Sequence, residues 1–239
     1  MKGLRINKKC VSLHRFMSNN YFKFKKFIVF QDRCAMKVGT DGTLLGAWAE
    51  GGARILDIGT GTGLIALMMA QRYPESVVTA IDIDEEAVTQ ALANVQASPF
   101  ESQITVKNCA LQSHQGLYDA IVCNPPYFVD ALLCPDSQRK MARHAVTLGY
   151  DELMVSACRL LADDGVFSLV IPNDYRERLE SEAFLNGLFK CRECAVKTTL
   201  KKSPKRYLMA FRKRSACLQR SELVIGSDDY IELTSAFYL

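Results

Sequence analysis

A strand, a glycine-rich turn and a helix follow one another in residues 53–73, and this order restricts the fold more than any other feature. Residues 53–58 are a short apolar run that leads into Gly59-Thr60-Gly61-Thr62-Gly63. Residues 64–73 then repeat apolar side chains at helical spacing and stop before Pro74. Glycines let the backbone pass close to a ligand and let the amides at the helix start point at it. The pattern predicts an α/β fold with a ligand at this turn.

The spacing of these glycines indicates which cofactor binds. Gly-x-Gly-x-Gly differs from the Gly-x-Gly-x-x-Gly spacing that fits the pyrophosphate of a dinucleotide. Asp57, just before the turn, would repel a phosphate but could hold an ammonium group, directly or through water. S-adenosylmethionine is therefore favoured over a nicotinamide cofactor. The expected cofactor residues here are Asp57, Gly59, Thr60, Gly61 and Gly63.

An acidic residue also ends the next apolar run. Residues 77–81 are followed by Asp82-Ile83-Asp84. An acid at the end of the second strand can accept both hydroxyls of a ribose, as in nucleotide-binding α/β folds. We therefore expect Asp82, with Ile83 beside it, at the cofactor, and we expect Asp84 to cap a helix over residues 85–95.

A third strand-like run, residues 118–123, leads into Asn124-Pro125-Pro126-Tyr127. Each proline fixes φ and removes a backbone donor, so nearby carbonyls stay available to accept hydrogen bonds. The side-chain oxygen of Asn124 and the carbonyl of Pro125 can accept both protons of a planar amine while Tyr127 stacks on the attached ring. The alternative is an ordinary turn after a strand, since Asn and Pro are common there. Together with the upstream pattern, these four residues are the expected catalytic group.

Length and composition indicate one α/β domain. The chain has 239 residues, 49% of them hydrophobic, which suffices for a sizeable core. We expect residues 1–20 to form a flexible basic tail and residues 21–239 a single domain with an open, mostly parallel sheet of seven main strands and helices on both faces. Further expected helices cover residues 150–161 and 174–189, and further expected strands cover residues 166–171, 194–200 and 207–212, with a short last strand near Leu223–Ile225.

Several functional classes are disfavoured. The nine cysteines are odd in number and scattered, which suits a reducing cytoplasm better than a disulfide framework. Cys191 and Cys194 lack a second Cys or His pair at zinc-site spacing. No apolar run approaches the roughly 20 residues that span a membrane. We therefore expect a cytoplasmic, monomeric protein without a metal or a membrane segment.

The positive charge is concentrated in two segments. Residues 1–37 contain ten Lys or Arg and one acid, and residues 197–214 contain eight Lys or Arg and no acid. Aromatic residues interleave the first segment: Tyr21, Phe22, Phe24, Phe27 and Phe30. Lysines for phosphates and rings for unpaired bases are typical of RNA recognition, although a solvated face and a half-buried strand are alternatives. The expected RNA contacts are Lys23, Lys25, Lys26, Lys201, Lys202, Lys205 and Arg206.

One further stretch makes a family resemblance specific. It reads Met36-Lys37-Val38-Gly39-Thr40-Asp41-Gly42-Thr43-Leu44-Leu45-Gly46-Ala47-Trp48. With the glycine turn, Asn-Pro-Pro-Tyr and the end Thr234-Ser235-Ala236-Phe237-Tyr238-Leu239, residues 21–239 resemble the bacterial tRNA1(Val) adenine-37 N6-methyltransferase family. The resemblance implies a Rossmann-like class I methyltransferase that modifies the adenine beside the anticodon of a valine tRNA.

The resemblance also implies cofactor residues before the turn. In related enzymes this stretch closes over the cofactor, which assigns Lys37, Thr40, Asp41 and Gly42 to the cofactor side. The residues alone predict an N-capped helix that begins at Asp41. Many class I enzymes place an acid after the third strand, near the cofactor's adenine, whereas this chain has Asn108-Cys109 there. Asn108, Cys109 or a backbone amide would have to serve instead.

Other functions share parts of this pattern. A release-factor glutamine N5-methyltransferase uses the same platform, because a glutamine amide is also a planar amine. A guanine-N2 rRNA methyltransferase, an adenine-N6 DNA methyltransferase and a non-catalytic RNA-binding protein are further alternatives. Only about fifty residues precede the glycine strand, and this stretch is basic overall. It is not a helical substrate-binding domain, which disfavours the release-factor enzyme.

Overall fold

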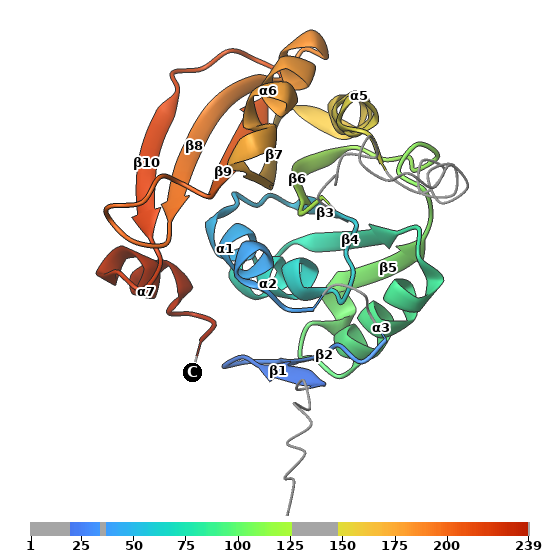
Figure 1. Ribbon diagram of the computed structural model, residues 1–239. Helices are drawn as coiled ribbons and strands as arrows, with labels where there is room; N and C mark the ends of the chain where they lie inside the picture. The colour runs from blue at the N-terminus through green and yellow to red at the C-terminus, as the bar shows by residue number, and fades with distance from the viewer. Residues whose placement is uncertain (1–19, 34–36, 126–147, 239) are drawn as a thin grey trace, which may run out of the picture.

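The computed structural model describes residues 20–33, 37–125 and 148–238, so nearly all of the expected tail, residues 1–20, lies outside the described residues. Within them, eight strands form one sheet in the order β10-β8-β9-β7-β6-β3-β4-β5, and β1 and β2 form a separate hairpin (Figure 1). The strands are β1 Tyr21–Lys23, β2 Ile28–Phe30, β3 Arg54–Ile58, β4 Val77–Asp82, β5 Ile104–Asn108, β6 Tyr118–Cys123, β7 Leu161–Pro172, β8 Phe189–Lys197, β9 Arg206–Arg212 and β10 Gln219–Val224. The helices are α1 Thr40–Trp48, α2 Leu64–Arg72, α3 Glu85–Gln96, α5 Tyr150–Leu160, α6 Arg176–Leu185 and α7 Asp228–Thr234, with short 3-10 helices at Glu101–Gln103 and Asn173–Tyr175.

The parallel strands bring the expected site residues to one edge of the sheet. β3 pairs in parallel with β4 on one side and with β6 on the other, and Ile58 lies opposite Cys123. The chain thus runs outward from β3 to β5 and returns to β6 across β3. Ligands in open α/β sheets bind beyond the carboxyl ends of strands at such a reversal. The glycine turn follows β3 and Asn124 follows β6, so both lie at this edge.

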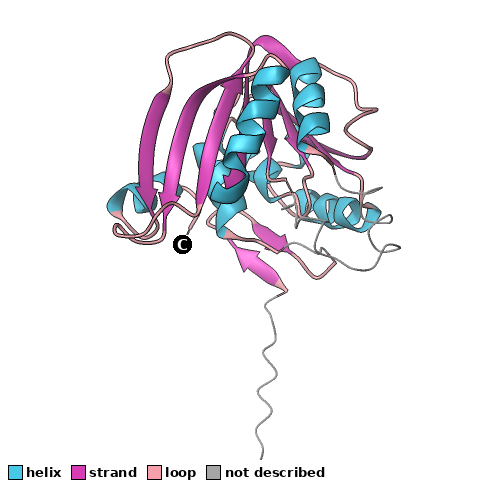
Figure 2. Ribbon diagram, turned by 45° about the horizontal axis from the view of Figure 1, so that its top comes forward, coloured by secondary structure: helices cyan, strands magenta, loops and turns pink. Residues whose placement is uncertain are grey.

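Successive residues of the strands pack on opposite faces of the sheet. Val166 and Val170 of β7 join the core that contains α1 and α2, whereas Phe167 and Leu169 join the core that contains α5 and α6. Because side chains alternate along a strand, both faces are buried beneath helices. Figure 2 shows helices on both sides of the strands. The prediction of a mostly parallel sheet covered on both faces is confirmed.

The sheet has one strand more than the seven main strands predicted. The additional strand, β10, pairs in parallel with β8 at the edge of the sheet. A short strand was expected near Leu223–Ile225, but β10 already begins at Gln219. Its first four residues are polar and exposed, so this edge strand lacks the apolar signal by which strands are recognised.

Predicted boundaries in the second half of the chain are also wrong. The helix expected over 174–189 ends at Leu185, and the strand expected from Cys194 begins at Phe189. β7 begins at Leu161, where the end of a helix was predicted. Apolar residues at such junctions suit either a helix or a strand. Cross-strand pairing decides, because Leu161 lies opposite Tyr118 in the sheet.

The aromatic residues of the β1–β2 hairpin belong in part to the core. Phe24 and Phe27 are buried, with ring centroids 4.8 Å apart, and Phe24 also stacks on Tyr238 near the C-terminus. The expectation that the hairpin rings stack on RNA bases is therefore wrong for Phe24 and Phe27. Tyr21 and Phe30 remain exposed.

Candidate active site

The glycine turn leaves open space at the edge of the sheet. Gly59, Gly61 and Gly63 have φ angles of 67°, 55° and 81°, a region that other residues rarely adopt. A Cβ at Gly59 would meet no atom within 4 Å, whereas a Cβ at Gly63 would lie 3.4 Å from Ala91. Gly63 therefore allows α3 to pack closely, and the space beside Gly59 is available to a ligand.

Asp57 supports the turn from the buried end of β3. Its Oδ2 accepts a 2.6 Å hydrogen bond from Thr60 Oγ1 and a 3.1 Å hydrogen bond from the Ala66 amide. Its Oδ1 is buried and has no hydrogen-bond partner among the described residues. Burial raises the pKa of Asp57 to about 7, because the charged form loses hydration. An ammonium group near Oδ1 would satisfy this oxygen, so the site fits the amino acid end of S-adenosylmethionine.

Asp82 connects the end of β4 to the turn. Its Oδ2 accepts a 2.9 Å hydrogen bond from the Gly61 amide, and its Oδ1 accepts a 3.0 Å hydrogen bond from the Asp84 amide. Asp84 in turn caps α3 by accepting from the Glu86 amide, as predicted. A carboxylate oxygen has two lone pairs, so Asp82 can hold the turn and still accept ribose hydroxyls. Ile83 lies exposed beside it.

Asn108 and Cys109 lie next to Asp82 but use their donors on the protein. Asn108 Nδ2 donates to the carbonyls of Asp82 and Ile83 at 3.2 and 3.1 Å, and the Cys109 amide donates to the Asp82 carbonyl at 3.0 Å. Cys109 Sγ lies 3.5 Å from His114 Nδ1. These bonds fasten the end of β5 to β4 at the cofactor edge. Contact of either residue with the cofactor's adenine stays a prediction.

Asn124 lies where three segments converge. A Cβ built on Gly42 would be 3.9 Å from Asn124 Nδ2 and 3.1 Å from Leu64 Cδ2. The first turn of α1, the first residue of α2 and the end of β6 therefore pack together, and glycine permits this close approach. Pro125 is buried beside Asn124. Pro126 and Tyr127 lie outside the described residues, and their roles stay predictions.

The helix before the glycine turn, α1, differs slightly from the one predicted. It begins at Thr40 rather than Asp41, and its N-cap residue is Gly39, which has no side chain to cap the helix. Asp41 lies inside the first turn and forms an ion pair with Arg206. Lys37 is exposed just before the helix. The structure thus brings Asp41 and Gly42 to the site edge, and Arg206, expected at RNA, reaches the same place.

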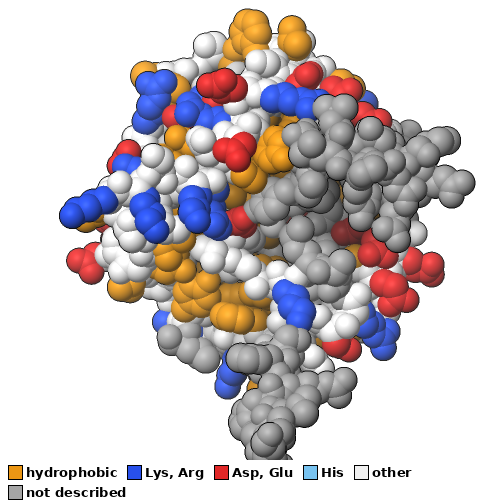
Figure 3. Space-filling model, viewed as in Figure 1, with side chains coloured by type: hydrophobic (Ala, Val, Ile, Leu, Met, Phe, Trp, Pro, Cys, Tyr) orange, Lys and Arg blue, Asp and Glu red, His pale blue; other side chains and the backbone are white. Residues whose placement is uncertain are grey.

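The lysines of the second basic segment lie at the site edge. Lys201, Lys202 and Lys205 are exposed in the loop between β8 and β9. Arg206, which follows this loop, pairs with Pro172 at the carboxyl end of β7. In Figure 3, Lys and Arg side chains gather on the left of the view, over the ends of β8 and β10 and the neighbouring loop. This placement is compatible with RNA that reaches Asn124.

The described lysines of the β1–β2 hairpin belong to the first basic segment and lie apart from the β8–β9 loop. Lys23, Lys25 and Lys26 are exposed on the β1–β2 hairpin, which Figure 1 shows apart from the β8–β9 loop. Lys25 Nζ donates a 2.7 Å hydrogen bond to the Ser235 carbonyl. Among the described residues, these three lysines therefore do not form one surface with the lysines of the β8–β9 loop.

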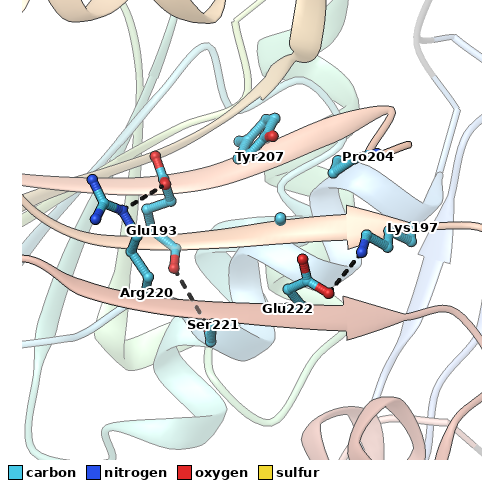
Figure 4. A pocket seen from close by; sticks show the side chains of 8 residues that line it. Glu193, Lys197, Pro204, Tyr207, Arg220, Ser221 and Glu222 are labelled. Atoms are coloured by element: carbon cyan, nitrogen blue, oxygen red, sulfur yellow. Dashed lines mark hydrogen bonds and ion pairs between the residues drawn. The ribbon is translucent and has the colours of Figure 1, made fainter. Parts of the chain in front are cut away.

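A surface hollow of about 540 Å³ on the outer strands is separate from this site. It is lined by residues of β8, β9 and β10 together with Pro204. Glu193 pairs with Arg220 at 3.5 Å and Lys197 pairs with Glu222 at 2.7 Å within it (Figure 4). Its charges compensate one another, so the hollow offers no clear preference for an anionic ligand.

Asn94 supports the site and carries no recognisable signal in the sequence. It is fully buried on α3, where its Oδ1 accepts from the Phe30 amide and its Nδ2 donates to the carbonyls of Phe30 and Thr62, all within 2.9 Å. One amide group thereby connects the N-terminal hairpin to the glycine turn. A polar residue in a helix is ordinary, so only the folded structure reveals this role.

Two kinds of feature are absent from the described ranges. No helix in residues 20–33, 37–125 or 148–238 is both long and apolar enough to cross a bilayer. In the same ranges, no three His, Cys, Asp or Glu side chains form a group that could hold a metal ion.

Solved structures share this fold. A protein described as a predicted O-methyltransferase from Agrobacterium tumefaciens has a TM-score of 0.66 at 17% identity, over 82% of this chain and 96% of that one. The CcbJ methyltransferase from Streptomyces caelestis has a TM-score of 0.53 at 14% identity, over 73% and 89%. At these identities the likeness concerns the fold alone, and it confirms the predicted Rossmann-like α/β fold.

Sequence relatives are much closer. The model of the family described as "Methyltransferase small domain" matches residues 43–201. A tRNA1(Val) (adenine(37)-N6)-methyltransferase from Phocaeicola vulgatus is 48% identical over 234 residues, which is 93% of this chain and 99% of the relative. A protein of the same name from Citrobacter koseri is 41% identical over 93% of this chain and 96% of the relative. The resemblance found in the motifs is thus confirmed, and the chain belongs to the tRNA1(Val) (adenine(37)-N6)-methyltransferase family.

Proposed function

We propose that this enzyme transfers the methyl group of S-adenosylmethionine to the N6 amine of adenine 37 in the anticodon loop of tRNA1(Val). One observation carries the proposal: Asn124, directly after β6, lies next to Gly42 in the first turn of α1, and β6 pairs with β3, the strand that leads into the open glycine turn. An amine held by Asn124 would therefore be next to a cofactor at the turn. The names of relatives at 41–48% identity support the same reaction.

The chain's main task is to make a weak nucleophile reactive. The lone pair of an adenine amine is delocalised into the ring. The amine donates two hydrogen bonds, one to the Asn124 side-chain oxygen and one to the Pro125 carbonyl. These bonds favour a more tetrahedral nitrogen and direct its lone pair toward the cofactor. The bound cofactor supplies a methyl group on a sulfonium, which is already activated. Orientation of the reactants can then contribute about 7–11 kcal/mol, and no base of shifted pKa is required before transfer.

Little free energy is needed to expose the target base in an anticodon loop. Adenine 37 is unpaired there, so it can leave the stack at low cost. We expect Tyr127 to stack on it, and we expect the exposed lysines of the β8–β9 loop to hold loop phosphates. We further expect the enzyme to be cytoplasmic and monomeric. Sedimentation of the purified protein with and without tRNA would test the monomeric state.

Methyl transfer to tRNA tests the proposal directly. The protein is incubated with labelled S-adenosylmethionine and, in separate reactions, with total tRNA from a strain that lacks its gene or with unmethylated release factor. The nucleosides of the tRNA are then analysed. We expect N6-methyladenosine in the valine tRNA. Label in release factor but not in tRNA would instead indicate the glutamine methyltransferase, and label in another nucleoside would contradict the target atom.

A further inference from the structure

Arg206 connects the basic loop to the cofactor side of the fold. It is the first residue of β9, directly after the loop between β8 and β9, and its guanidinium pairs with Asp41 of α1, 165 positions away. Leu208, two residues later, packs in the core that contains α1. Because side chains alternate along a strand, Arg206 points to the same face. It thus turns toward α1 and away from the hollow lined by Tyr207 (Figure 4).

Asp41 occupies a sensitive position in α1. The next residue, Gly42, is the point at which α1 approaches Leu64 of α2 and Asn124. A displacement of Asp41 would therefore move the first turn of α1 relative to both the glycine turn and the expected catalytic amide. The ion pair with Arg206 restrains this turn.

The loop on the other side of Arg206 is tied to the sheet at its end. The Lys205 amide donates to the Val196 carbonyl at 3.1 Å, and the Lys205 carbonyl accepts from the Asn173 amide at 3.0 Å. The tip of the loop is exposed, and the Leu200 side chain there is 81% exposed. A ligand bound at the tip would therefore act on the start of β9, and Arg206 is the first residue of that strand.

The Arg206–Asp41 pair is shielded from solvent. The Arg206 side chain is 23% exposed and that of Asp41 is 18% exposed. Burial raises the pKa of Asp41 to about 6 and lowers the pKa of Arg206. Two partly desolvated charges of opposite sign attract each other, and this attraction is lost when either one is replaced. The lysines of the loop, by contrast, are exposed.

We propose that Arg206 is a positioning residue that acts through Asp41: it holds the first turn of α1 in place and thereby couples RNA binding at the β8–β9 loop to cofactor binding. The inference rests on the proposed function for its RNA part. It reassigns Arg206 from a phosphate contact to a link between the two binding sites. Coupling of this kind is reciprocal, so the cofactor also strengthens RNA binding.

Equilibrium binding of S-adenosylhomocysteine, with and without an anticodon stem-loop RNA, tests this link. We expect Arg206→Gln to weaken binding without RNA by about 5-fold or more and to remove the tightening that RNA causes in the unmodified protein. Arg206→Lys keeps the charge and should bind more tightly than Arg206→Gln. Lys197→Gln is the matched control, because it breaks the Lys197–Glu222 pair on the same hairpin but away from α1 (Figure 4).

A double variant separates the link from a general loss of structure. If Arg206 acts through Asp41, Asp41→Asn with Arg206→Gln weakens S-adenosylhomocysteine binding no more than the stronger single variant. Additive losses would overturn the proposal. A second result would also overturn the proposal: Arg206→Gln leaves the S-adenosylhomocysteine affinity unchanged but reduces the salt slope of RNA binding by about 0.7. That result is expected if Arg206 contacts a phosphate. Absence of tRNA methylation would overturn the proposed function, while the RNA-free measurements would still decide whether Arg206 positions α1.

Discussion

The glycine-turn edge and the outer strands are held together by different interactions. At the turn, short acids accept hydrogen bonds from nearby backbone amides: Asp57 from Ala66, and Asp82 from Gly61. In the outer strands β8–β10, ion pairs join side chains from separate segments, as in Lys197–Glu222 and Arg206–Asp41. In the first arrangement, backbone amides donate to carboxylates, one of which, Asp57, is fully buried. In the second, oppositely charged side chains meet and stay partly exposed.

This difference indicates how each region contributes to function. A turn fixed by hydrogen bonds from its backbone amides to carboxylates can present a cofactor in one orientation, as the methyl transfer requires. Under the proposed function, the exposed lysines would attract RNA without requiring one geometry, because a lysine can approach a phosphate from many directions. Substitutions at the turn edge should therefore abolish chemistry or cofactor binding, whereas substitutions in the outer loop should change affinity in small steps.

The largest effect is expected for Asn124→Ala. Loss of the acceptor for the target amine should reduce methyl transfer by at least about 10²–10³-fold, as for removal of one precisely aimed polar group in other active sites. Affinity for S-adenosylhomocysteine should stay nearly unchanged. Single-turnover transfer and calorimetric binding measure the two quantities. Asn186→Ala, which removes an amide bonded to Glu182 on α6, is the control. Parallel loss of transfer and cofactor affinity would point to misfolding.

Gly59→Ala separates backbone strain from loss of the ligand space. Gly59 and Gly187 have φ angles of 67° and 75°, and a Cβ at either would meet no atom within 4 Å. Alanine at either position should cost about 1–2 kcal/mol of stability, because the left-handed region is unfavourable for it. Only Gly59→Ala should also weaken cofactor binding. Equal cofactor affinity of the two variants would show that the space beside Gly59 is not the cofactor site.

Asp57→Asn sharpens the contrast through pH. The pKa of buried Asp57 is about 7, against an ordinary value of 3.8, so the folded protein binds its proton more tightly than the unfolded chain. The corresponding stabilisation is present below about pH 4 and is lost as the pH rises toward 7. Urea unfolding of the cofactor-free protein at pH 5 and pH 8 should therefore show a larger fall in stability for the unmodified protein than for Asp57→Asn. The same fall in both would mean that Asp57 is not desolvated.

The smallest effects are expected in the β8–β9 loop. Lys201→Gln or Lys202→Gln should reduce the salt slope of tRNA binding by about 0.7 each, with cofactor affinity unchanged. Lys213→Gln is a suitable control, since Lys213 follows the far end of β9 and pairs with Asp163. Binding measured between low and physiological salt gives the slopes. A reduction as large for Lys213→Gln would show that the loop has no special role.

Local patterns predicted the turn edge well. Gly59, Gly61 and Gly63 form the expected turn between a strand and a helix, and Asp84 caps α3 as expected. β10 could not be predicted in full, because its first four residues are polar and exposed and only their pairing with β8 makes them part of the strand. Asn94 was missed for a similar reason, since its three bonds depend on segments that meet only after folding.

The sequence by itself determined the order of strand, glycine turn, acid and Asn-Pro pair, because each of these features expresses a backbone requirement of a few adjacent residues. The tertiary structure decided which distant side chains meet. It buried Phe24 against Tyr238, and it placed Arg206 on Asp41 rather than on the surface with its neighbouring lysines. The physical reason is that a charge or a ring has no preferred partner along the chain. Its partner is set by how the sheet and helices bring remote segments together.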